Sequence, residues 1–155
     1  MAGSKPLLQY VSFALGKEIF ALDVMKIKGV ERITDITAIP KYPTFIEGVI
    51  NLRGEIIPIV DLRKRFGMQG TDYTKETRVI LLELEMIVIG LIVDRVFEVF
   101  ELAEGEIGHI PSFSKITVGR QFVQGVAEVR DKLIVLLNMD TLFSEEETGS
   151  LSGGV

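Results

Sequence analysis

The chain has 155 residues, about the size of one domain or of two small lobes that share a core. Hydrophobic residues make up 47% of it but aromatic residues only 8%, so the apolar content is mainly Ile, Val and Leu, which favour strands. The net charge of −5 argues against a nucleic-acid binder, which usually carries a basic surplus. The lack of Cys excludes thiol chemistry, and the single histidine, His109, leaves little for a metal site or a catalytic triad.

Nothing in the sequence predicts insertion into a membrane. The longest apolar run, residues 80–93, is too short to cross a bilayer and contains Glu83 and Glu85. Residues 1–6 lack the apolar segment of a signal peptide. We therefore expect a soluble, cytoplasmic protein.

The first half of the chain predicts short strands. Residues 7–23 predict two strands around a turn, and residues 24–33 predict one helical turn followed by a strand. Residues 48–62 predict two more strands separated by a break at Gly54. Pro58 lies inside the second of these, which indicates an edge position or a bulge.

A short helix is predicted next, capped by Asp61 and ending at Gly67. Residues 77–102 then predict three strands. Residues 122–143 predict a hairpin followed by a short helix that begins near Asn138 or Asp140.

The tail, residues 144–155, is acidic and rich in Gly and Ser. We expect it to be disordered, with the acidic run 145–147 solvated.

An internal repeat is the strongest organisational signal. Residues 48–66 align without gaps onto residues 125–143, at a spacing of 77 residues. The identical pairs are Gly48/Gly125, Val49/Val126, Arg53/Arg130, Ile57/Ile134 and Phe66/Phe143. A period of about half the chain predicts two similar β-rich lobes, approximately residues 7–75 and 76–143, between which terminal strands can exchange.

No catalytic constellation emerges from the residues. Phosphate-binding glycine loops, the HExxH zinc motif and the GxSxG nucleophile motif are all absent. Asp23 and Asp94 each follow an apolar strand, and we interpret them as turn or N-cap residues at matching places in the two lobes. We predict no catalytic residue, no metal and no cofactor, so the residues alone indicate a binding or scaffolding protein.

The stretch FIEGVINLRGEIIPIVDLRKRFG, residues 45–67, resembles the signature of the CheW family of bacterial chemotaxis adaptors. The segments FALDVMKIKGVERI, TRVILLELEMIVIGLIVDRVFEVF and QGVAEVRDKLIVLLNMDTLF match the family pattern in order and spacing, so the resemblance covers residues 7–143. It implies an all-β fold of two SH3-like five-stranded β-barrels packed side by side, with short helices in the connections.

The resemblance also implies a function and its partners. The family couples the cytoplasmic tip of methyl-accepting chemoreceptors to the regulatory domain of the histidine kinase CheA, without enzymatic activity. The implied protein is a monomer in isolation, joins ring-like arrays with CheA, and is recruited to receptors at the inner face of the membrane.

Residues for both contacts can be carried over from the family. The receptor-binding positions are Ile27, Gly48, Arg53 and Val99, and the kinase-binding positions are Ile36, Thr37 and Phe113. Some relatives carry an acidic residue at position 29 that can pair with the arginine. This chain has Gly29 there, and Glu31 is the candidate replacement.

Three alternatives stay open at this point. The chain can be an isolated regulatory domain of a CheA-type kinase, a small β-barrel nucleic-acid binder, or an enzyme with an unrecognised site. The net charge disfavours the second alternative, and the single His and the absence of Cys disfavour the third.

Overall fold

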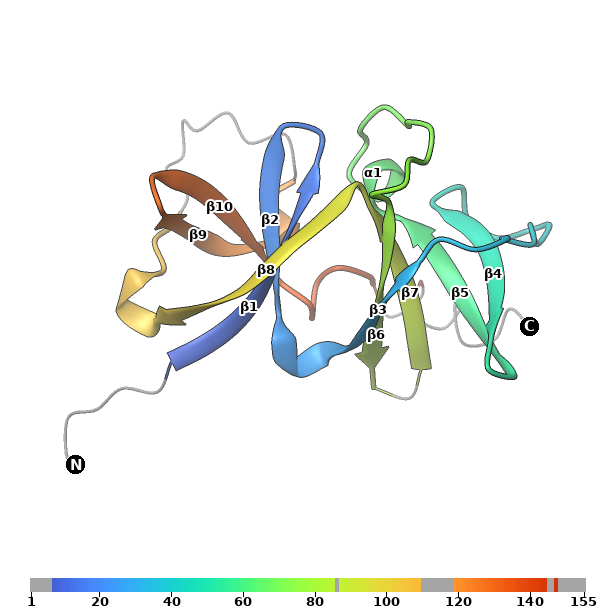
Figure 1. Cartoon of the computed structure of the whole chain (residues 1–155), viewed down its shortest axis with the longest axis horizontal. Helices are drawn as coiled ribbons and strands as arrows, with labels where there is room; N and C mark the ends of the chain where they lie inside the picture. Colours follow the sequence, from blue (N-terminus) through green and yellow to red (C-terminus); the bar gives the residue numbers. More distant parts are fainter. Residues whose placement is uncertain (1–6, 86, 110–118, 145–146, 148–155) are drawn as a thin grey trace.

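The computed structural model describes residues 7–85, 87–109, 119–144 and 147. These residues form two five-stranded sheets that lie side by side as two lobes (Figure 1). The expected all-β fold of two five-stranded barrels is confirmed.

One lobe is built from both ends of the chain, and we call it the terminal lobe. Its strands are β1 (Leu7–Leu15), β2 (Glu18–Asp23), β8 (Arg95–Ala103), β9 (Val123–Val129) and β10 (Lys132–Leu137), in the order β8-β1-β2-β10-β9. The other, the middle lobe, contains β3 (Ile27–Arg32), β4 (Ile46–Leu52), β5 (Glu55–Asp61), β6 (Arg78–Leu84) and β7 (Ile87–Val93), in the order β3-β6-β7-β5-β4. The sheets therefore do not divide the chain near residue 75. The first two strands of the chain, β1 and β2, share a sheet with the last three, β8 to β10, and the parallel pairing of β2 with β10 links them.

The internal repeat corresponds to one hairpin in each lobe. In β4–β5, Leu52 pairs with Glu55 across the turn, and in β9–β10 Val129 pairs with Lys132 in the same register. Each hairpin also has a bulge in its first strand and one bridge from the preceding connection, Thr37–Val49 in one and Gly108–Val126 in the other. The strands of the two lobes thus correspond one to one in sheet order.

Short helical turns join the strands: η1 (Val24–Lys26), α1 (Leu62–Arg65), η2 (Glu104–Glu106) and η3 (Arg120–Phe122). The predicted N-cap of α1 is confirmed, since the Lys64 N–H donates to Asp61 Oδ1 at 3.3 Å. The helix predicted near Asn138 is wrong. The Asp140 N–H donates to Asn138 Oδ1 at 2.9 Å, and this local bond forms a turn in place of a helix.

The largest hydrophobic cluster lies between the lobes and draws side chains from both. A chain of ring contacts runs through it, from Phe13 to Phe20 (5.9 Å between centroids), to Phe66 (5.8 Å) and to Phe122 (5.4 Å). Each lobe also has a smaller cluster of its own. Strands with one face on the shared core and the other on their own cluster need apolar residues on both faces, which explains the continuous apolar runs.

Pro58 shows why its strand was misjudged from sequence. The strand β5 is internal, between β7 and β4, so the predicted edge position is wrong. The pairing between β5 and β7 begins at Ile59, one residue after Pro58. No hydrogen bond of that pairing therefore needs an N–H at Pro58. The corresponding residue of the terminal lobe, Val135, does lie within the parallel ladder, opposite Phe20.

Among the described residues, two largely buried ion pairs and the exposed pair Arg95–Glu76 join the lobes. Asp94 is not an N-cap: its carboxylate accepts from the Gly16 N–H at 2.7 Å and from Arg63 Nε at 2.9 Å. Burial opposes ionisation of Asp94, but these hydrogen bonds outweigh it and hold the pKa of Asp94 below its ordinary value. Asp94 therefore joins a hairpin of the terminal lobe to α1 of the middle lobe.

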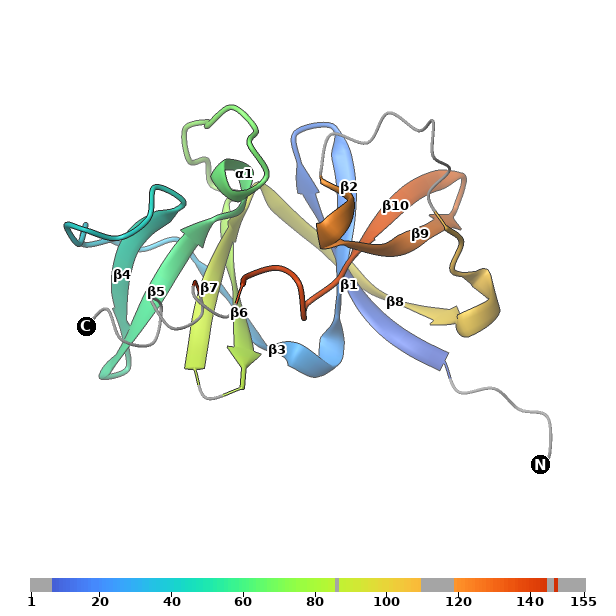
Figure 2. The same ribbon diagram turned by 180° about the vertical axis from the view of Figure 1, so that it is seen from behind.

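The second pair involves the C-terminal segment. After β10 the chain crosses toward the middle lobe (Figure 2). There Arg65 donates twice to Glu147, at 2.7 Å each, while its guanidinium lies 4.8–5.4 Å from the ring centroids of Phe45, Phe122 and Phe143. Glu147 thus differs from the expected solvated run. The rest of the predicted disordered tail, apart from Ser144, lies outside the described residues.

Candidate functional site

Arg53 projects from a tight turn at one end of the middle lobe. It and Gly54 form the two-residue connection of the β4–β5 hairpin, with φ of 53° and 87°, as a type I′ turn requires. The Arg53 side chain is 78% exposed, and its Nη2 donates to Glu31 Oε1 on β3 at 3.1 Å. Glu31 therefore does supply the carboxylate that position 29 lacks.

The terminal lobe has an equivalent arginine–glutamate pair at its matching turn. Arg130 begins the matching turn with φ of 51°, and its Nη1 lies 2.6 Å from Glu98 Oε1 on β8. Val99, paired with Val11 on β1, corresponds to Val30, paired with Ile80 on β6. The residues one position earlier, Glu98 and Gly29, therefore correspond as well. The acidic partner is thus two residues further along its strand in the middle lobe, on the same face of the sheet.

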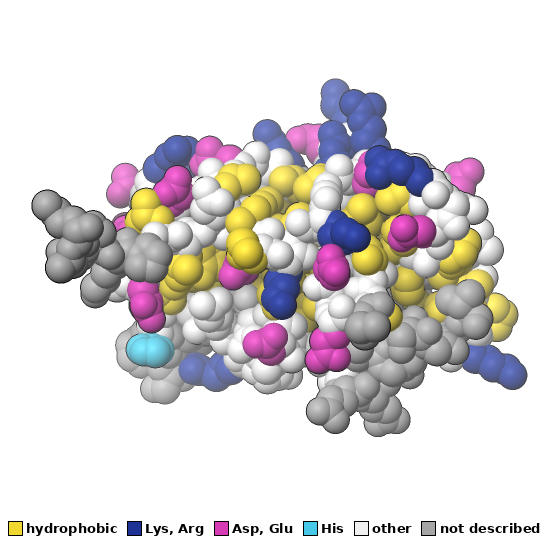
Figure 3. All heavy atoms as spheres, turned by 90° about the horizontal axis from the view of Figure 1, so that it is seen from below, with side chains coloured by type: hydrophobic (Ala, Val, Ile, Leu, Met, Phe, Trp, Pro, Cys, Tyr) yellow, Lys and Arg dark blue, Asp and Glu magenta, His cyan; other side chains and the backbone are white. Residues whose placement is uncertain are grey.

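The two apolar receptor candidates lie on different sheets. Ile27 begins β3, pairs with Leu82 and packs, half-buried, against the shared core. Val99 lies on β8 opposite Val11 and is 55% exposed. The view from below shows hydrophobic side chains over much of the long face, with acidic and basic ones between them (Figure 3).

Gly48 lies against the predicted kinase surface. A Cβ added to Gly48 would stand 2.1 Å from the carbonyl oxygen of Thr37, and its φ of 148° is unusual for other residues. Thr37 exchanges two backbone hydrogen bonds of 2.9 Å with Val49, while Ile36 packs half-buried against the cluster of the middle lobe. The structure therefore brings Gly48 together with Thr37. Phe113 lies outside the described residues.

A polar depression of about 400 Å³ lies beside this edge. It is lined by Glu47 of β4 and by Asp61, Lys64 and Tyr73, and Lys64 pairs with Glu47. Burial raises the pKa of Tyr73 to about 12, with the charges of Glu47 and Asp61 adding to the effect. This surface can offer hydrogen bonds and charge to a partner at neutral pH.

Sequence analysis missed the Glu98–Arg130 pair. The internal repeat aligns Arg130 with Arg53, so the sequence did indicate an equivalent arginine in the second lobe. The partner on β8 lies outside the repeat, and only the sheet order shows that β8 corresponds to β3.

Two kinds of feature are absent from the described part of the chain. It contains no helix long and apolar enough to cross a membrane. It also contains no group of three or more His, Cys, Asp or Glu side chains that could hold a metal ion.

Comparison with known proteins now adds an independent observation. The CheW-like domain matches residues 9–147. The chain belongs to the CheW family. A chemotaxis protein CheW from Klebsiella aerogenes is 34% identical over 95% of this chain and 88% of its own length. The CheW of Thermotoga maritima is 34% identical over 88% of each chain.

A solved structure supports the same conclusion. The scaffolding protein TtCheW from Thermoanaerobacter tengcongensis superimposes with a TM-score of 0.82 at 37% identity, covering 95% of this chain and 94% of its own. The predicted family and fold are therefore both confirmed. Among the functions considered, the chemotaxis adaptor is supported over the alternatives.

Proposed function

We propose that this protein is a non-enzymatic adaptor that couples chemoreceptors to the histidine kinase CheA. The observation that carries the proposal is the CheW-like match over residues 9–147 together with the two-lobed structure. In this proposal the protein is cytoplasmic, a monomer when isolated, and joins ring-like arrays with CheA beneath the membrane.

The receptor contact is assigned to the surface around Arg53. Its guanidinium presents five donors in a planar fork that carboxylates and helix-terminal carbonyls of a receptor hairpin can accept. The exposed pair with Glu31 holds the fork in one orientation at small energetic cost. Ile27 and Val99 would supply the apolar anchors for a helix laid into a groove.

The kinase contact is assigned to the outer edge of β4. The strand β4 ends its sheet, and on its outer side Thr37 exchanges two backbone hydrogen bonds with Val49 in an isolated bridge. An end strand with free backbone groups favours pairing with another β-barrel. Ile36 adds apolar surface there, and Phe113 supports the second, ring-forming contact. Gly48, which the sequence assigned to the receptor contact, keeps the Thr37 segment close and so links the two proposed surfaces.

The two assignments are tested by measuring, for each variant, the loss of receptor binding and the loss of kinase binding separately. The protein is titrated with a receptor-tip fragment and, in parallel, with the CheA regulatory domain. Arg53→Ala is expected to weaken receptor binding tenfold or more and leave kinase binding within twofold. Ile36→Glu is expected to weaken kinase binding by about 2 kcal/mol, as for a buried hot spot.

Matched variants come from the other lobe. Ile107 is the counterpart of Ile36, and Val30 is the counterpart of Val99. Ile107→Glu should leave kinase binding at the β4 edge unchanged. Val99→Glu should weaken receptor binding, whereas Val30→Glu should not. If Arg53→Ala and Ile36→Glu each weaken both partners equally while circular dichroism is unchanged, the two surfaces are not separate and the assignment fails.

A further inference from the structure

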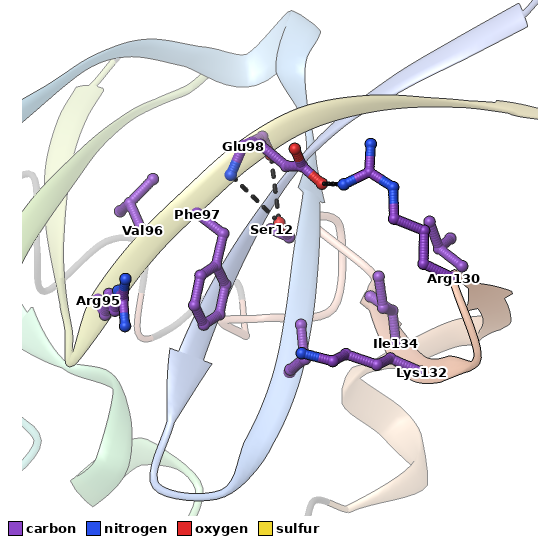
Figure 4. Close-up of a pocket in the computed structure, with 10 residues that line it drawn as sticks. Ser12, Arg95, Val96, Phe97, Glu98, Arg130, Lys132 and Ile134 are labelled. Carbon is purple, nitrogen blue, oxygen red and sulfur yellow. Dashed lines mark hydrogen bonds and ion pairs between the residues drawn. The ribbon is translucent and has the colours of Figure 1, made fainter.

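The terminal lobe has an open mouth that the proposed function does not use. A pocket of about 350 Å³ lies between β8 and the β9–β10 hairpin, within the usual range of ~300–1,000 Å³ for ligand sites. Its side walls are Phe97 of β8 and Ile134 of β10, with Ser12 between them (Figure 4). The strands β8 and β9 end the sheet, so at this mouth the barrel is spanned by the Glu98–Arg130 side-chain pair.

The two mouths differ first in the size of one residue beneath the end strand. By register Ser12 corresponds to Leu81, which is 6% exposed and lies 3.9 Å from where a Cβ of Gly29 would be. Leucine thus fills the space beneath β3. In the terminal lobe, Ser12 bonds instead to the backbone of Glu98, with its Oγ 3.2 Å from the carbonyl oxygen. The smaller side chain leaves room beneath β8.

The rim of the pocket carries a positive excess on an acidic protein. Arg95 pairs with Glu76 and Arg130 with Glu98, at 3.1 and 2.6 Å. Lys132 also lines the pocket, is exposed, and forms no ion pair among the described residues. Its counterpart in the middle lobe is Glu55, of the opposite charge.

The walls offer a place for one bulky apolar side chain. Phe97 is 43% exposed and lies in the bulge of β8, where two residues oppose one of β1. Arg95 stacks on its ring at 5.2 Å, which fixes the ring beside the pocket. Ile19 and Val129 add apolar surface from β2 and β9.

We propose that this mouth is a docking site for an acidic segment of a partner protein. One bulky apolar side chain of that segment enters between Phe97 and Ile134, and a carboxylate next to it binds Lys132. Charge complementarity selects this occupant, because the rim cation has no carboxylate of its own to satisfy it. None of the proposed receptor or kinase positions lines the site, although Val99 directly follows Glu98 on β8, so the site does not depend on the proposed function.

The probe is a fluorescein-labelled dodecapeptide of alternating Glu and Ser with one central Phe. Two control peptides replace Phe with Ser, or every Glu with Lys. Fluorescence anisotropy with the full chain is expected to give a Kd below 1 mM for the first peptide and at least tenfold weaker binding for both controls. Equal binding of the Lys peptide, or no binding of the Glu peptide, overturns the proposal.

Variants that import the residues of the middle lobe test the site itself. Lys132→Glu and Ser12→Leu should each weaken the Glu peptide at least tenfold. Lys132 is exposed, so its variant tests the proposal even if Ser12→Leu fails to fold. Glu55→Lys is the matched control: it places the same cation on the filled mouth of the middle lobe, and should not add a second site.

Methyl chemical shifts locate the bound peptide. Those of Ile19, Val129 and Ile134 should move on titration, while those of Ile57 and Leu81 should not. Shifts confined to the middle lobe would overturn the assignment, as would unchanged binding by Lys132→Glu.

Discussion

The two lobes share one framework and differ in what it presents. Each has five strands in corresponding order, a hairpin with a type I′ turn, and an arginine at that turn that pairs with a glutamate on an end strand. The middle lobe adds α1 and fills its mouth with Leu81, whereas the terminal lobe has a turn after β10 and an open mouth over Ser12. A repeated framework therefore does not imply repeated function, which depends on the few residues that differ.

Alanine substitutions at the corresponding glycines Gly48 and Gly125 are expected to give the largest difference in protein stability between the lobes. In Gly48→Ala the new methyl meets the Thr37 carbonyl oxygen at 2.1 Å, and a positive φ adds strain. We expect a loss of about 2–3 kcal/mol. In Gly125→Ala the nearest atoms are 2.7 Å away and no positive φ is involved, so the loss should be smaller. Urea unfolding measures both, and equal losses would show that the two edges are equivalent.

Arg65 has no counterpart in the terminal lobe, where the aligned residue is Leu142. Because its guanidinium contacts three rings and its side chain is only 16% exposed, Arg65→Ala should cost about 2 kcal/mol, mostly through lost packing. Glu147→Gln keeps that packing and should cost about 1 kcal/mol or less. Thermal unfolding compares the two, and a larger effect for Glu147→Gln would show that the ion pair dominates.

The junction between the lobes should weaken in acid. The pKa of Asp94 and that of Glu147 both lie below their ordinary values of 3.8 and 4.5, although burial opposes both shifts. For Asp94 the hydrogen bonds from Arg63 and the Gly16 N–H outweigh burial. For Glu147 the hydrogen bond from the Ser144 N–H and the charge of Arg65 do so. Their contribution is complete above the ordinary values and is lost as pH falls through the lower folded-state values. The Tm should therefore be constant near pH 6–7 and fall below about pH 4.5.

Asp94→Asn is the control for this pH effect. It should lower stability by about 1 kcal/mol at pH 7, after allowing for solvent screening, and should flatten the acid limb of the Tm profile. An unchanged acid limb would mean that other carboxylates cause the acid loss.

The smallest effects on stability are expected at the two turn arginines. Both side chains are more than three-quarters exposed, at 78% for Arg53 and 76% for Arg130. Arg53→Ala and Arg130→Ala should each change the free energy of unfolding by about 0.5 kcal/mol or less. A larger loss in either would indicate that the pair closes its barrel and is not primarily a binding device.

Local patterns predicted most elements of the fold, because turn glycines, caps and apolar runs act over a few residues. The cap by Asp61 and the three strands after residue 77 are examples. The pairing of strands was harder to predict: the parallel contact between β2 and β10 joins residues more than a hundred positions apart. Pro58 was misjudged for the same reason, and Asp94, although it lies at the predicted turn, has an ion pair that local sequence does not show.

The candidate site was predictable only in part. The resemblance supplied Arg53, and strand periodicity made Glu31 a plausible partner on the same face as position 29. The contact of Gly48 with Thr37 was not visible, because it depends on how the connection before β4 folds back onto that strand. The open mouth of the terminal lobe depends on the size of Ser12, which no pattern in the sequence distinguishes.

The most direct test of functional asymmetry compares the two turn arginines in one assay. Arg53→Ala and Arg130→Ala are titrated with the same receptor-tip fragment, with circular dichroism as the folding control. We expect at least a tenfold loss of affinity for Arg53→Ala and less than a twofold change for Arg130→Ala. Equal losses, or a loss only for Arg130→Ala, would contradict the assignment of the receptor contact to the middle lobe.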